Sequence, residues 1–241
     1  MLLKLLQMLV NSFDTKYSQT AGKYEYLDNN FTNLLAKDQR FSRIFTSIVE
    51  NQKLDFSSDI VLRSDITGQV INTILTHDFK SEHFLYYMGD VFKPDLVNKS
   101  IKQYRQHGLE IINRPKMESF VEVIKILDRL LKKTLKNNFI YIFTDPKINN
   151  KSNFVFNSKS PTNKMNTYVN SFNKAIKAPY KINLEKNFFS KDYHRDIFFY
   201  VYSDKTKKIL AQGGGYQYKK SNKKIDGFGF SCNVDNLVEI I

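Results

Sequence analysis

Two stretches in the middle of the chain alternate apolar with polar residues and predict a long β-hairpin. The first, Phe84 to Lys93, opens with an apolar and aromatic run of the length and composition of a buried strand. It reaches Pro94, where a central strand could not continue because proline has no backbone N–H to donate. After a polar loop, the alternation resumes from Tyr104 to Ile112.

Three polar residues on this hairpin are candidates for binding a small molecule. Gln106 and Glu110 are four residues apart, an even spacing that directs both side chains to one face of a regular strand. Lys93 stands at the end of the first strand. A cation, an amide and a carboxylate on one sheet face suit a zwitterion such as an amino acid. The alternative is a surface hairpin with solvated polar side chains, and these residues alone do not decide between the two.

Two further segments have the 3.6-residue periodicity of amphipathic helices. Met117 to Lys136 is the clearest, with lysines on its outer face and near its C-terminus, where they also suit the helix dipole. The second follows Ser64 and Asp65, either of which could cap its first turn. Capping alone would explain Asp65 and Thr67 without any functional role. The residues expected to be buried are Phe120, Val121, Val123, Ile124, Ile126, Leu127, Leu130 and Leu131 in the first helix, and Val70, Ile71, Ile74 and Leu75 in the second.

Other apolar runs predict short strands and two terminal helices. The strands are Phe41 to Val49, Ile60 to Arg63, Phe139 to Phe143, Ile197 to Tyr202, Ile209 to Ala211 and Gly227 to Cys232. Amphipathic helices are expected up to about Lys16 and from Asn233 to Ile241. Consecutive hairpins, with helices at the ends and on one face, predict an α+β fold with a mostly antiparallel sheet.

The whole chain, residues 1–241, fits one domain with a divergent insertion at about residues 145–185. The insertion is rich in Asn, Lys and Ser and contains one weak helical pattern, Asn166 to Ile176. Further on, Gly213, Gly214 and Gly215 would let the backbone approach a ligand or a neighbouring strand closely. A run of glycines is also typical of a bulge or turn.

Composition narrows the range of partners. The formal net charge is +13, but the lysines are spread along the chain, as expected of an AT-rich genome. We therefore expect an anionic ligand or partner rather than nucleic acid. The single cysteine, Cys232, excludes an intramolecular disulfide and a cysteine-based zinc site, and it fits a reducing cytoplasm. The histidines show no metal-ligand spacing, and no segment approaches the length of a membrane span, so neither a metal, a cofactor nor a membrane is expected.

Six segments occur in an order that resembles a known family. Val61 to Thr67 (VLRSDIT) is similar to LRPDMT or LRPEMT, and Tyr86 to Lys93 (YYMGDVFK) is similar to the class II motif 2 strand YYIGDVFR. Gln106 to Glu110 (QHGLE) is similar to QAGVE, and Asp192, Tyr193 and Ile197 to Phe199 are similar to GLDYYTGIVFE. Ala211 to Tyr216 (AQGGGY) is similar to AGGRYD, and Gly229 to Leu237 is similar to motif 3, GFAIGLERL. The chain resembles the histidyl-tRNA synthetase catalytic core and, more closely, its catalytically disabled paralogue, the regulatory subunit of ATP phosphoribosyltransferase. The resemblance covers roughly Ser42 to Leu237 and implies a class II aminoacyl-tRNA synthetase-like sheet flanked by helices.

Departures from the synthetase pattern fall on groups that hold ATP phosphates. The motif 2 arginine is Lys93, which keeps the charge but loses the bidentate fork. The motif 3 arginine is Asn236, which cannot neutralise a triphosphate, and the arginine of AGGRYD is Gly215. The arginine that precedes GLDYYTG falls at Phe188 or Phe189. The chain also stops soon after motif 3, so no anticodon-binding domain is expected.

The pocket that this family uses for histidine is largely kept. The resemblance implies acceptors for the ammonium group or the imidazole, a cation for the carboxylate, side chains beside the imidazole, and glycines that leave room for the ligand. By this resemblance, the acceptors are Asp65, Thr67, Gln106 and Glu110, and the cation is Lys93. The side chains beside the imidazole are Tyr193 and His194, and the glycines are Gly213 and Gly214. The alternative is an inherited fold whose pocket has drifted and binds nothing.

We therefore expect a non-catalytic subunit that activates the short-form catalytic subunit of ATP phosphoribosyltransferase and mediates feedback inhibition by histidine, in the first step of histidine biosynthesis. The family implies a homodimer that assembles with catalytic subunits into a cytoplasmic hetero-octamer, with free histidine as the effector. The alternative is a degenerate histidyl-tRNA synthetase-like protein with aminoacylation or RNA-binding activity. The scattered lysines, without a basic and aromatic motif, weigh against RNA.

Overall fold

The computed structural model describes residues 20–49, 61–78, 80–95, 98–136, 138–145, 161–183, 194–203 and 205–241. The helix predicted up to about Lys16, the first residue of the strand predicted from Ile60 to Arg63 and part of the insertion at 145–185 lie outside these residues. Within them, no helix is both long and apolar enough to cross a membrane.

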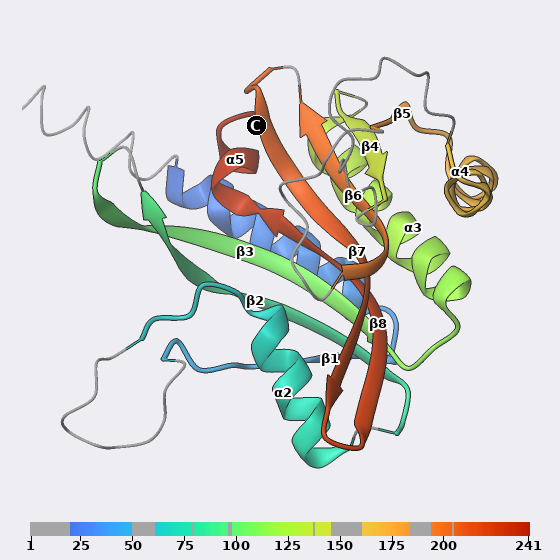
Figure 1. Cartoon of the computed structure of the whole chain (residues 1–241). Helices are drawn as coiled ribbons and strands as arrows, with labels where there is room; N and C mark the ends of the chain where they lie inside the picture. The colour runs from blue at the N-terminus through green and yellow to red at the C-terminus, as the bar shows by residue number, and fades with distance from the viewer. Residues whose placement is uncertain are drawn as a thin grey trace, which may run out of the picture.

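The described strands form one sheet, whose members are β1 (Phe41–Arg43), β2 (His83–Asp95), β3 (Ser100–Ile112), β4 (Ile140–Thr144), β5 (Tyr180–Ile182), β6 (His194–Ser203), β7 (Lys208–Lys220) and β8 (Lys223–Asn233). Their order is β1-β2-β3-β8-β7-β6-β4-β5 (Figure 1). Neighbours pair antiparallel, except that the edge strands β1 and β5 run parallel to β2 and β4. The predicted α+β fold with a mostly antiparallel sheet is confirmed.

Helices cover both faces of this sheet (Figure 1). α2 (Thr67–His77) lies on one face, which we call the α2 face. α3 (Lys116–Leu135), α4 (Asn163–Ala175) and the helical residues 20–35 pack on the other, which we call the α3 face. A short helix, α5 (Val234–Val238), follows β8 directly.

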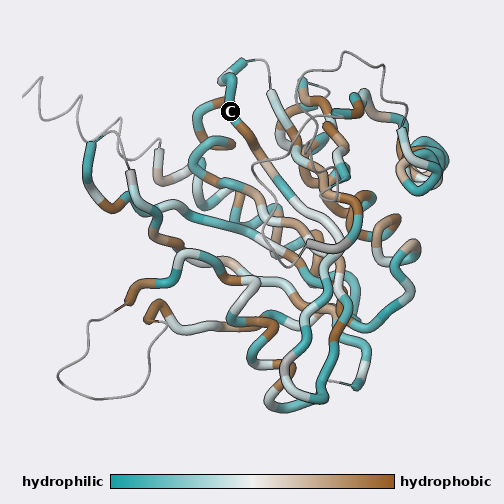
Figure 2. The backbone as a smooth tube through the Cα atoms, in the orientation of Figure 1, coloured by the Kyte–Doolittle hydropathy of each residue, from teal (hydrophilic) through white to brown (hydrophobic). Residues whose placement is uncertain are grey.

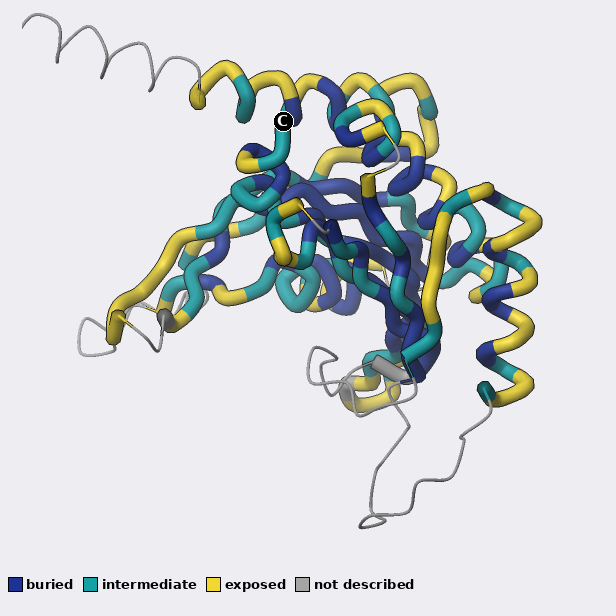
Figure 3. The backbone as a smooth tube through the Cα atoms, turned by 90° about the horizontal axis from the view of Figure 1, so that it is seen from above, coloured by how far each residue is buried: buried dark blue, intermediate teal, exposed yellow. Residues whose placement is uncertain are grey.

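Each face has its own hydrophobic core. On the α3 face, the cluster includes Phe31, Phe120 and Phe143. On the α2 face, a smaller cluster includes Val70 and Tyr87. Apolar residues are concentrated in the strands and on the inner sides of the helices (Figure 2), and the buried residues fill the centre of the molecule (Figure 3).

α3 forms where the periodicity predicted it. Of its eight residues expected to be buried, all except Val121 are buried. The helix is followed by Lys136, which caps it at a positive φ of 59°. In α2, the four residues expected to be buried are also buried. An amphipathic face is therefore enough to locate both helices, because burial of that face stabilises each of them.

The hairpin of β2 and β3 is confirmed and is longer than predicted. Tyr87 pairs with Gly108 and Gly89 with Gln106, and β2 continues beyond Pro94 to Asp95. β1 pairs with β2 only from Phe84 to Tyr86, so among the described strands this end of β2 has β3 as its one neighbour. Proline is tolerated at such an edge because one side of the strand needs no N–H donor.

Other predictions at the sheet edges were less accurate. The strand expected from Phe41 to Val49 is limited to β1, with one isolated bridge between Val49 and Leu62. β5 was not predicted. The three glycines form no turn, because they lie inside β7. Gly213 and Gly214 pair with both β6 and β8, whereas Gly215 pairs with β8 and lies where the register between β6 and β7 shifts.

A partly buried polar cluster fixes the helical residues 20–35 to the α3 face of β3. The His107 imidazole is 1% exposed, stacks on Phe31 and lies with Nε2 2.7 Å from Asp28 Oδ1. Arg105 donates to both carboxylate oxygens of Asp28. Burial lowers the pKa of His107, although Asp28 opposes this effect. Burial raises the pKa of Asp28, but hydrogen bonds from His107 and Arg105 lower it to about 2.

This cluster predicts how stability depends on pH. In the folded protein the pKa of His107 lies below its ordinary value of 6.5. As the pH falls, the His107 imidazole is therefore protonated at a higher pH in the unfolded chain than in the folded one. The free energy of unfolding should therefore fall as the pH drops from about 7.5 to 5, by at most about 1.4 kcal/mol per pH unit. The contribution of Asp28 should be lost only at lower pH, between its ordinary pKa of 3.8 and about 2.

Urea unfolding at a series of pH values measures both effects. His107→Gln should reduce the pH dependence of the free energy of unfolding between about pH 7.5 and 5, because the buried imidazole at position 107 is removed. A wild-type stability that rises as the pH falls through this range would contradict the prediction. It would show that the imidazolium–Asp28 ion pair outweighs the effect of burial.

The close contact between Tyr87 and Gly108 gives a second stability prediction. A Cβ added at Gly108 would stand 2.1 Å from Cζ of the buried Tyr87 ring. Gly108→Ala should therefore lower the free energy of unfolding by about 1–3 kcal/mol, because the ring must move within a packed core. Gly22→Ala is the control, since a Cβ there meets nothing within 4 Å. The control should stabilise slightly, by up to about 1 kcal/mol, as expected for alanine in a helix. Equal effects of the two substitutions in urea unfolding would contradict the packing argument.

Candidate functional site

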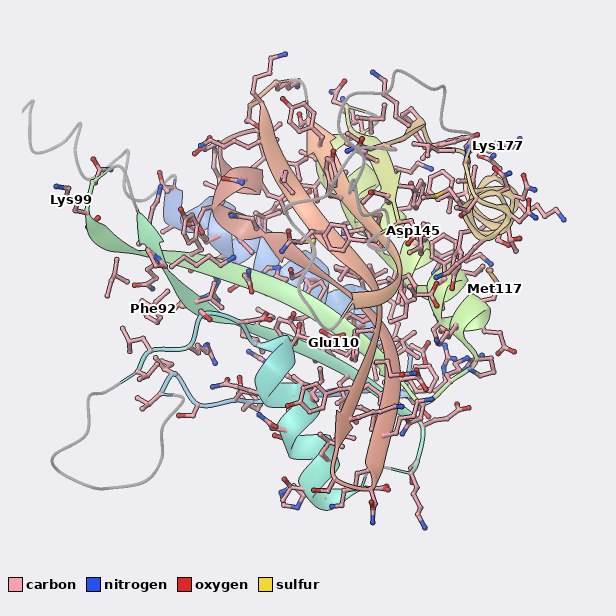
Figure 4. All side chains as sticks on the ribbon, viewed as in Figure 1. Phe92, Lys99, Glu110, Met117, Asp145 and Lys177 are labelled. Atoms are coloured by element: carbon pink, nitrogen blue, oxygen red, sulfur yellow. The ribbon has the colours of Figure 1, made fainter. Side chains whose placement is uncertain are left out.

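The candidate site lies on the α2 face, where β3 passes the N-terminus of α2. Glu110, labelled in Figure 4, projects from the centre of the sheet toward this helix end. Its side chain is buried, and its Oε1 accepts a hydrogen bond of 2.8 Å from the Thr67 hydroxyl, at the first residue of α2. The positive end of the helix dipole therefore lies beside a buried carboxylate, which it stabilises.

Tyr87 completes this group of side chains. It is 1% exposed, and its hydroxyl lies 3.4 Å from Thr67 Oγ1. Burial raises the pKa of Tyr87 well above its ordinary value, and the negative charges of Glu110 and Asp65 raise it further. Asp65, Thr67, Tyr87 and Glu110 therefore share one electrostatic environment, and we call them the carboxylate cluster.

The predicted capping role of Ser64 or Asp65 is wrong. The N-cap residue of α2 is Ile66, whose side chain makes no capping hydrogen bond. Ile66 takes this position because its side chain is buried in the core of the α2 face. Asp65 therefore precedes the N-cap residue, and it belongs to the carboxylate cluster through its charge near Tyr87.

Gly229 of β8 makes room for the carboxylate. It pairs with Glu110, and a Cβ there would lie 2.0 Å from Glu110 Oε2. Any larger residue would displace the glutamate from its place over the sheet. Gly214 of β7 pairs with Gly229, so two glycines lie side by side next to the carboxylate cluster.

A separate pocket of about 390 Å³ lies on the same face, further along β3 toward the hairpin loop. We call it the basic pocket. No carboxylate lines it, and Lys208 pairs with Glu239 at 2.6 Å. Gln106 joins the pocket to the cluster: it is 6% exposed, and its Oε1 accepts no hydrogen bond from the described residues. The lining residues are Lys93, Lys102, Tyr104, Gln106, Lys208, Ile209, Ala211, Gln212, Ser231, Asn233 and Asn236.

The structure does not bring Lys93 to the carboxylate cluster. Leu85 stands opposite Glu110, and Lys93 follows eight residues later on β2, opposite Lys102. Eight residues of strand span about 26 Å. A molecule as small as histidine cannot touch both side chains. Lys93 therefore cannot pair with the carboxylate of a histidine that is bound at Glu110. Gln106 is four residues, or about 13 Å, from Glu110 along the strand. A small ligand between these two side chains can contact both.

Gly213 also lies apart from the site. It pairs with Phe230, and a Cβ there would meet the Phe199 ring, which belongs to the core of the α3 face. Because strand residues alternate between faces, Gly214 is directed to the α2 face and Gly213 is not. Tyr193 lies outside the described residues. The backbone of His194 begins β6 opposite Tyr216, and its side chain is outside the described part.

The sequence analysis missed Tyr87 and Gly229. The signal for Gly229 was present, since Gly227, Phe228, Gly229 and Phe230 alternate small and large residues and thereby place both glycines on one face. Tyr87 could be placed only with the register that sets it opposite Gly108.

The two regions offer partners for both a positively charged and a negatively charged group. The carboxylate cluster offers acceptors for ammonium or imidazole N–H groups, and the basic pocket offers cations and amides for a negative group. No group of three or more His, Cys, Asp or Glu side chains in the described part could hold a metal ion.

Comparisons with known proteins agree with this fold. The sequence profile of the histidyl-tRNA synthetase family matches residues 25–152. No curated protein sequence matches the chain.

Three solved structures illustrate the similarity. Histidyl-tRNA synthetase from S. aureus is 17% identical with a TM-score of 0.68; the match covers 91% of this chain and 66% of that one. An ATP phosphoribosyltransferase regulatory subunit/histidyl-tRNA synthetase from Bacillus halodurans is 16% identical with a TM-score of 0.73, covering 91% and 79%. A chain of the ATP phosphoribosyltransferase (HisG:HisZ) complex from Thermotoga maritima is 14% identical with a TM-score of 0.69, covering 88% and 97%.

At this level of identity, the structures establish the class II aminoacyl-tRNA synthetase-like fold. The chain spans less than two thirds of the length of the S. aureus synthetase. The family profile, in contrast, matches more than half of the present sequence, including α2, the hairpin and α3. The chain therefore belongs to the histidyl-tRNA synthetase family.

Proposed function

We propose that the chain is a non-catalytic regulatory subunit that activates the short-form catalytic subunit of ATP phosphoribosyltransferase and makes that enzyme sensitive to histidine. The observation that carries this proposal is the contrast between the two halves of the site. In the carboxylate cluster, Glu110 and Tyr87 are buried and Thr67 donates to Glu110, whereas the positions that hold phosphates in a synthetase are Lys93 and Asn236, both in the lining of the basic pocket.

Histidine fits the carboxylate cluster by charge. Its ammonium group or an imidazole N–H would donate to Glu110, with Thr67, Tyr87 and Asp65 around it. Gln106 Oε1 would accept from a second N–H of the ligand. Hydrogen bonds to a charged acceptor in a site shielded from water are about twice as strong as neutral ones, which suits selective recognition of a free amino acid. Tyr193 and His194 stay predictions for the imidazole side.

The same geometry weighs against aminoacylation. Activation of histidine requires bidentate donors on the triphosphate as its charge develops. Asn236 donates instead to the carbonyl of Ile209 at 2.8 Å and carries no charge. Lys93 supplies a point charge in place of a planar fork.

Regulation would follow from linkage. Histidine must bind with different affinities to the active and inhibited arrangements of the complex, since equal binding would shift nothing. Under this proposal, the chain forms a homodimer and assembles in the cytoplasm with catalytic subunits into a hetero-octamer. The similarity to an ATP phosphoribosyltransferase regulatory subunit/histidyl-tRNA synthetase and to a chain of an ATP phosphoribosyltransferase complex supports this choice of partner.

A mixing experiment tests the function. The purified chain is added to a short-form catalytic subunit, and phosphoribosyl-ATP formation from ATP and phosphoribosyl pyrophosphate is followed with and without histidine. We expect stimulation over the catalytic subunit alone, and inhibition by histidine only in the mixture. An absence of stimulation would refute the regulatory role. Histidine-dependent exchange of pyrophosphate into ATP by the chain alone would instead support the synthetase-like alternative.

The carboxylate cluster gives a sharper prediction. Glu110→Gln keeps the shape of the side chain but removes its charge, so the affinity for histidine should fall at least about tenfold, as expected for loss of a charge-assisted hydrogen bond. Isothermal titration of histidine into the purified chain measures this. Glu118→Gln is the matched control, since Glu118 is exposed on α3 and pairs with Arg114 at 3.1 Å. Unchanged affinity in the Glu110 variant would place the histidine site elsewhere.

A further inference from the structure

The C-terminal half of α3 carries a row of cations on its outer side, which we call the basic stripe. At 100° per residue, the first four fall within an arc of about 100° on the helix surface, and the fifth is the C-cap residue. Every exposed residue between 123 and 136 belongs to it. Its members are Lys125, Arg129, Lys132, Lys133 and Lys136.

The stripe is not balanced by nearby acids. The one acidic residue in this half of the helix is Asp128, which is 5% exposed and pairs with Lys132 at 2.8 Å. The other four cations of the stripe have no carboxylate within 4 Å among the described residues. The first half of α3 differs, since Glu118 and Glu122 pair there with arginines.

The helix itself gives only a partial reason for these charges. The negative end of the helix dipole favours cations in the last turn, which accounts for Lys132 and Lys133. Lys125 and Arg129 lie too far from that end to benefit. Like charges spaced by four residues, as in Lys125, Arg129 and Lys133, destabilise a helix, so an anionic surface would relieve a repulsion present within the chain.

The stripe lies apart from the histidine site. α3 packs on the opposite face of the sheet from α2 and Glu110 (Figure 4). On its side, the positive surface continues, since Lys132 Nζ donates to the carbonyl of Lys177 at 3.5 Å and Lys174 and Lys177 are exposed. A partner bound there would leave the carboxylate cluster open to histidine.

We infer that the basic stripe is the docking surface for an acidic face of a protein partner. The inference rests on the proposed function, in which that partner is the catalytic subunit. Four of the five members are lysines, and an ammonium group pairs with single carboxylates as a point charge. Nucleic-acid sites favour several arginine forks together with exposed aromatic side chains, whereas the stripe has one arginine, Arg129, and no aromatic member. A second copy of this chain docking through the same stripe is disfavoured, because two equal rows of cations would face each other.

The test compares two triple variants with equal net charge. Lys125→Gln, Arg129→Gln and Lys133→Gln together remove three charges from the stripe, and glutamine preserves helix propensity. Lys37→Gln, Lys99→Gln and Lys219→Gln remove three exposed charges elsewhere and serve as the control. Affinity for the catalytic subunit is measured by surface plasmon resonance between about 0.05 and 0.3 M salt, alongside histidine affinity and circular dichroism.

The stripe variant should bind the catalytic subunit at least about tenfold more weakly at low salt and with a flatter salt dependence, while the control changes less than about twofold. Histidine affinity and helix content should match the wild type in both variants. If the wild type binds and activates the catalytic subunit but the stripe variant binds equally well, the docking surface is refuted and the proposed function stands. If the wild type neither binds nor activates, the proposed function fails and this inference with it. Loss of affinity for a polyanionic RNA, without loss for the subunit, would also overturn it.

Discussion

The buried carboxylate of Glu110 is the constraint on which the site depends. An ionised group removed from water costs several kcal/mol unless hydrogen bonds and nearby positive charge compensate it. Here the compensation includes the Thr67 hydroxyl and the positive end of α2, so the helix must begin where it does. Gly229 must lack a side chain for the same reason, because its Cβ would occupy the space of the carboxylate. The start of α2 and the glycine of β8 are therefore both matched to one buried carboxylate.

β3 presents chemically different residues to the two faces of the sheet. Gln106 and Glu110 are directed to the α2 face, whereas Arg105 and His107 between them are directed to the α3 face. There they hold Asp28 of the helical residues 20–35, and the backbone N–H of Arg105 donates to Asp235 of α5. A shift of β3 that improved contact with a ligand would therefore strain a buried ionic cluster on the other face. This coupling gives the proposed regulatory role a physical route, since a strand that is fixed on both faces moves as one unit with the elements that it holds.

The residues that the sequence placed correctly are those determined by local periodicity. The apolar stripes of α2 and α3 and the alternation of the hairpin depend on neighbours within one element, and all three were located from the sequence. Ile66 as N-cap and the isolated edge strand β5 depend on tertiary packing, which overrides local preference. Motif resemblance grouped Asp65, Thr67 and Glu110, and in the structure Thr67 donates to Glu110 while both carboxylates lie near Tyr87. The same resemblance also included Lys93 and Gly213. Only the pairing register shows that Lys93 is too distant, and only strand parity shows that Gly213 faces the other core.

The distance between Lys93 and Glu110 bears directly on how such a site can change its role. A synthetase must hold an amino acid and a triphosphate at once, whereas in this chain Lys93 and Glu110 lie eight strand residues, or about 26 Å, apart along the hairpin. In this chain the Glu110 end is stabilised independently, by Thr67, α2 and Gly229, and does not depend on the cations at the other end. Replacement of arginines by Lys93 and Asn236 could therefore abolish phosphate chemistry without disturbing the carboxylate cluster. Because the two ends have separate structural supports, loss of catalysis and retention of amino-acid binding are compatible in one fold.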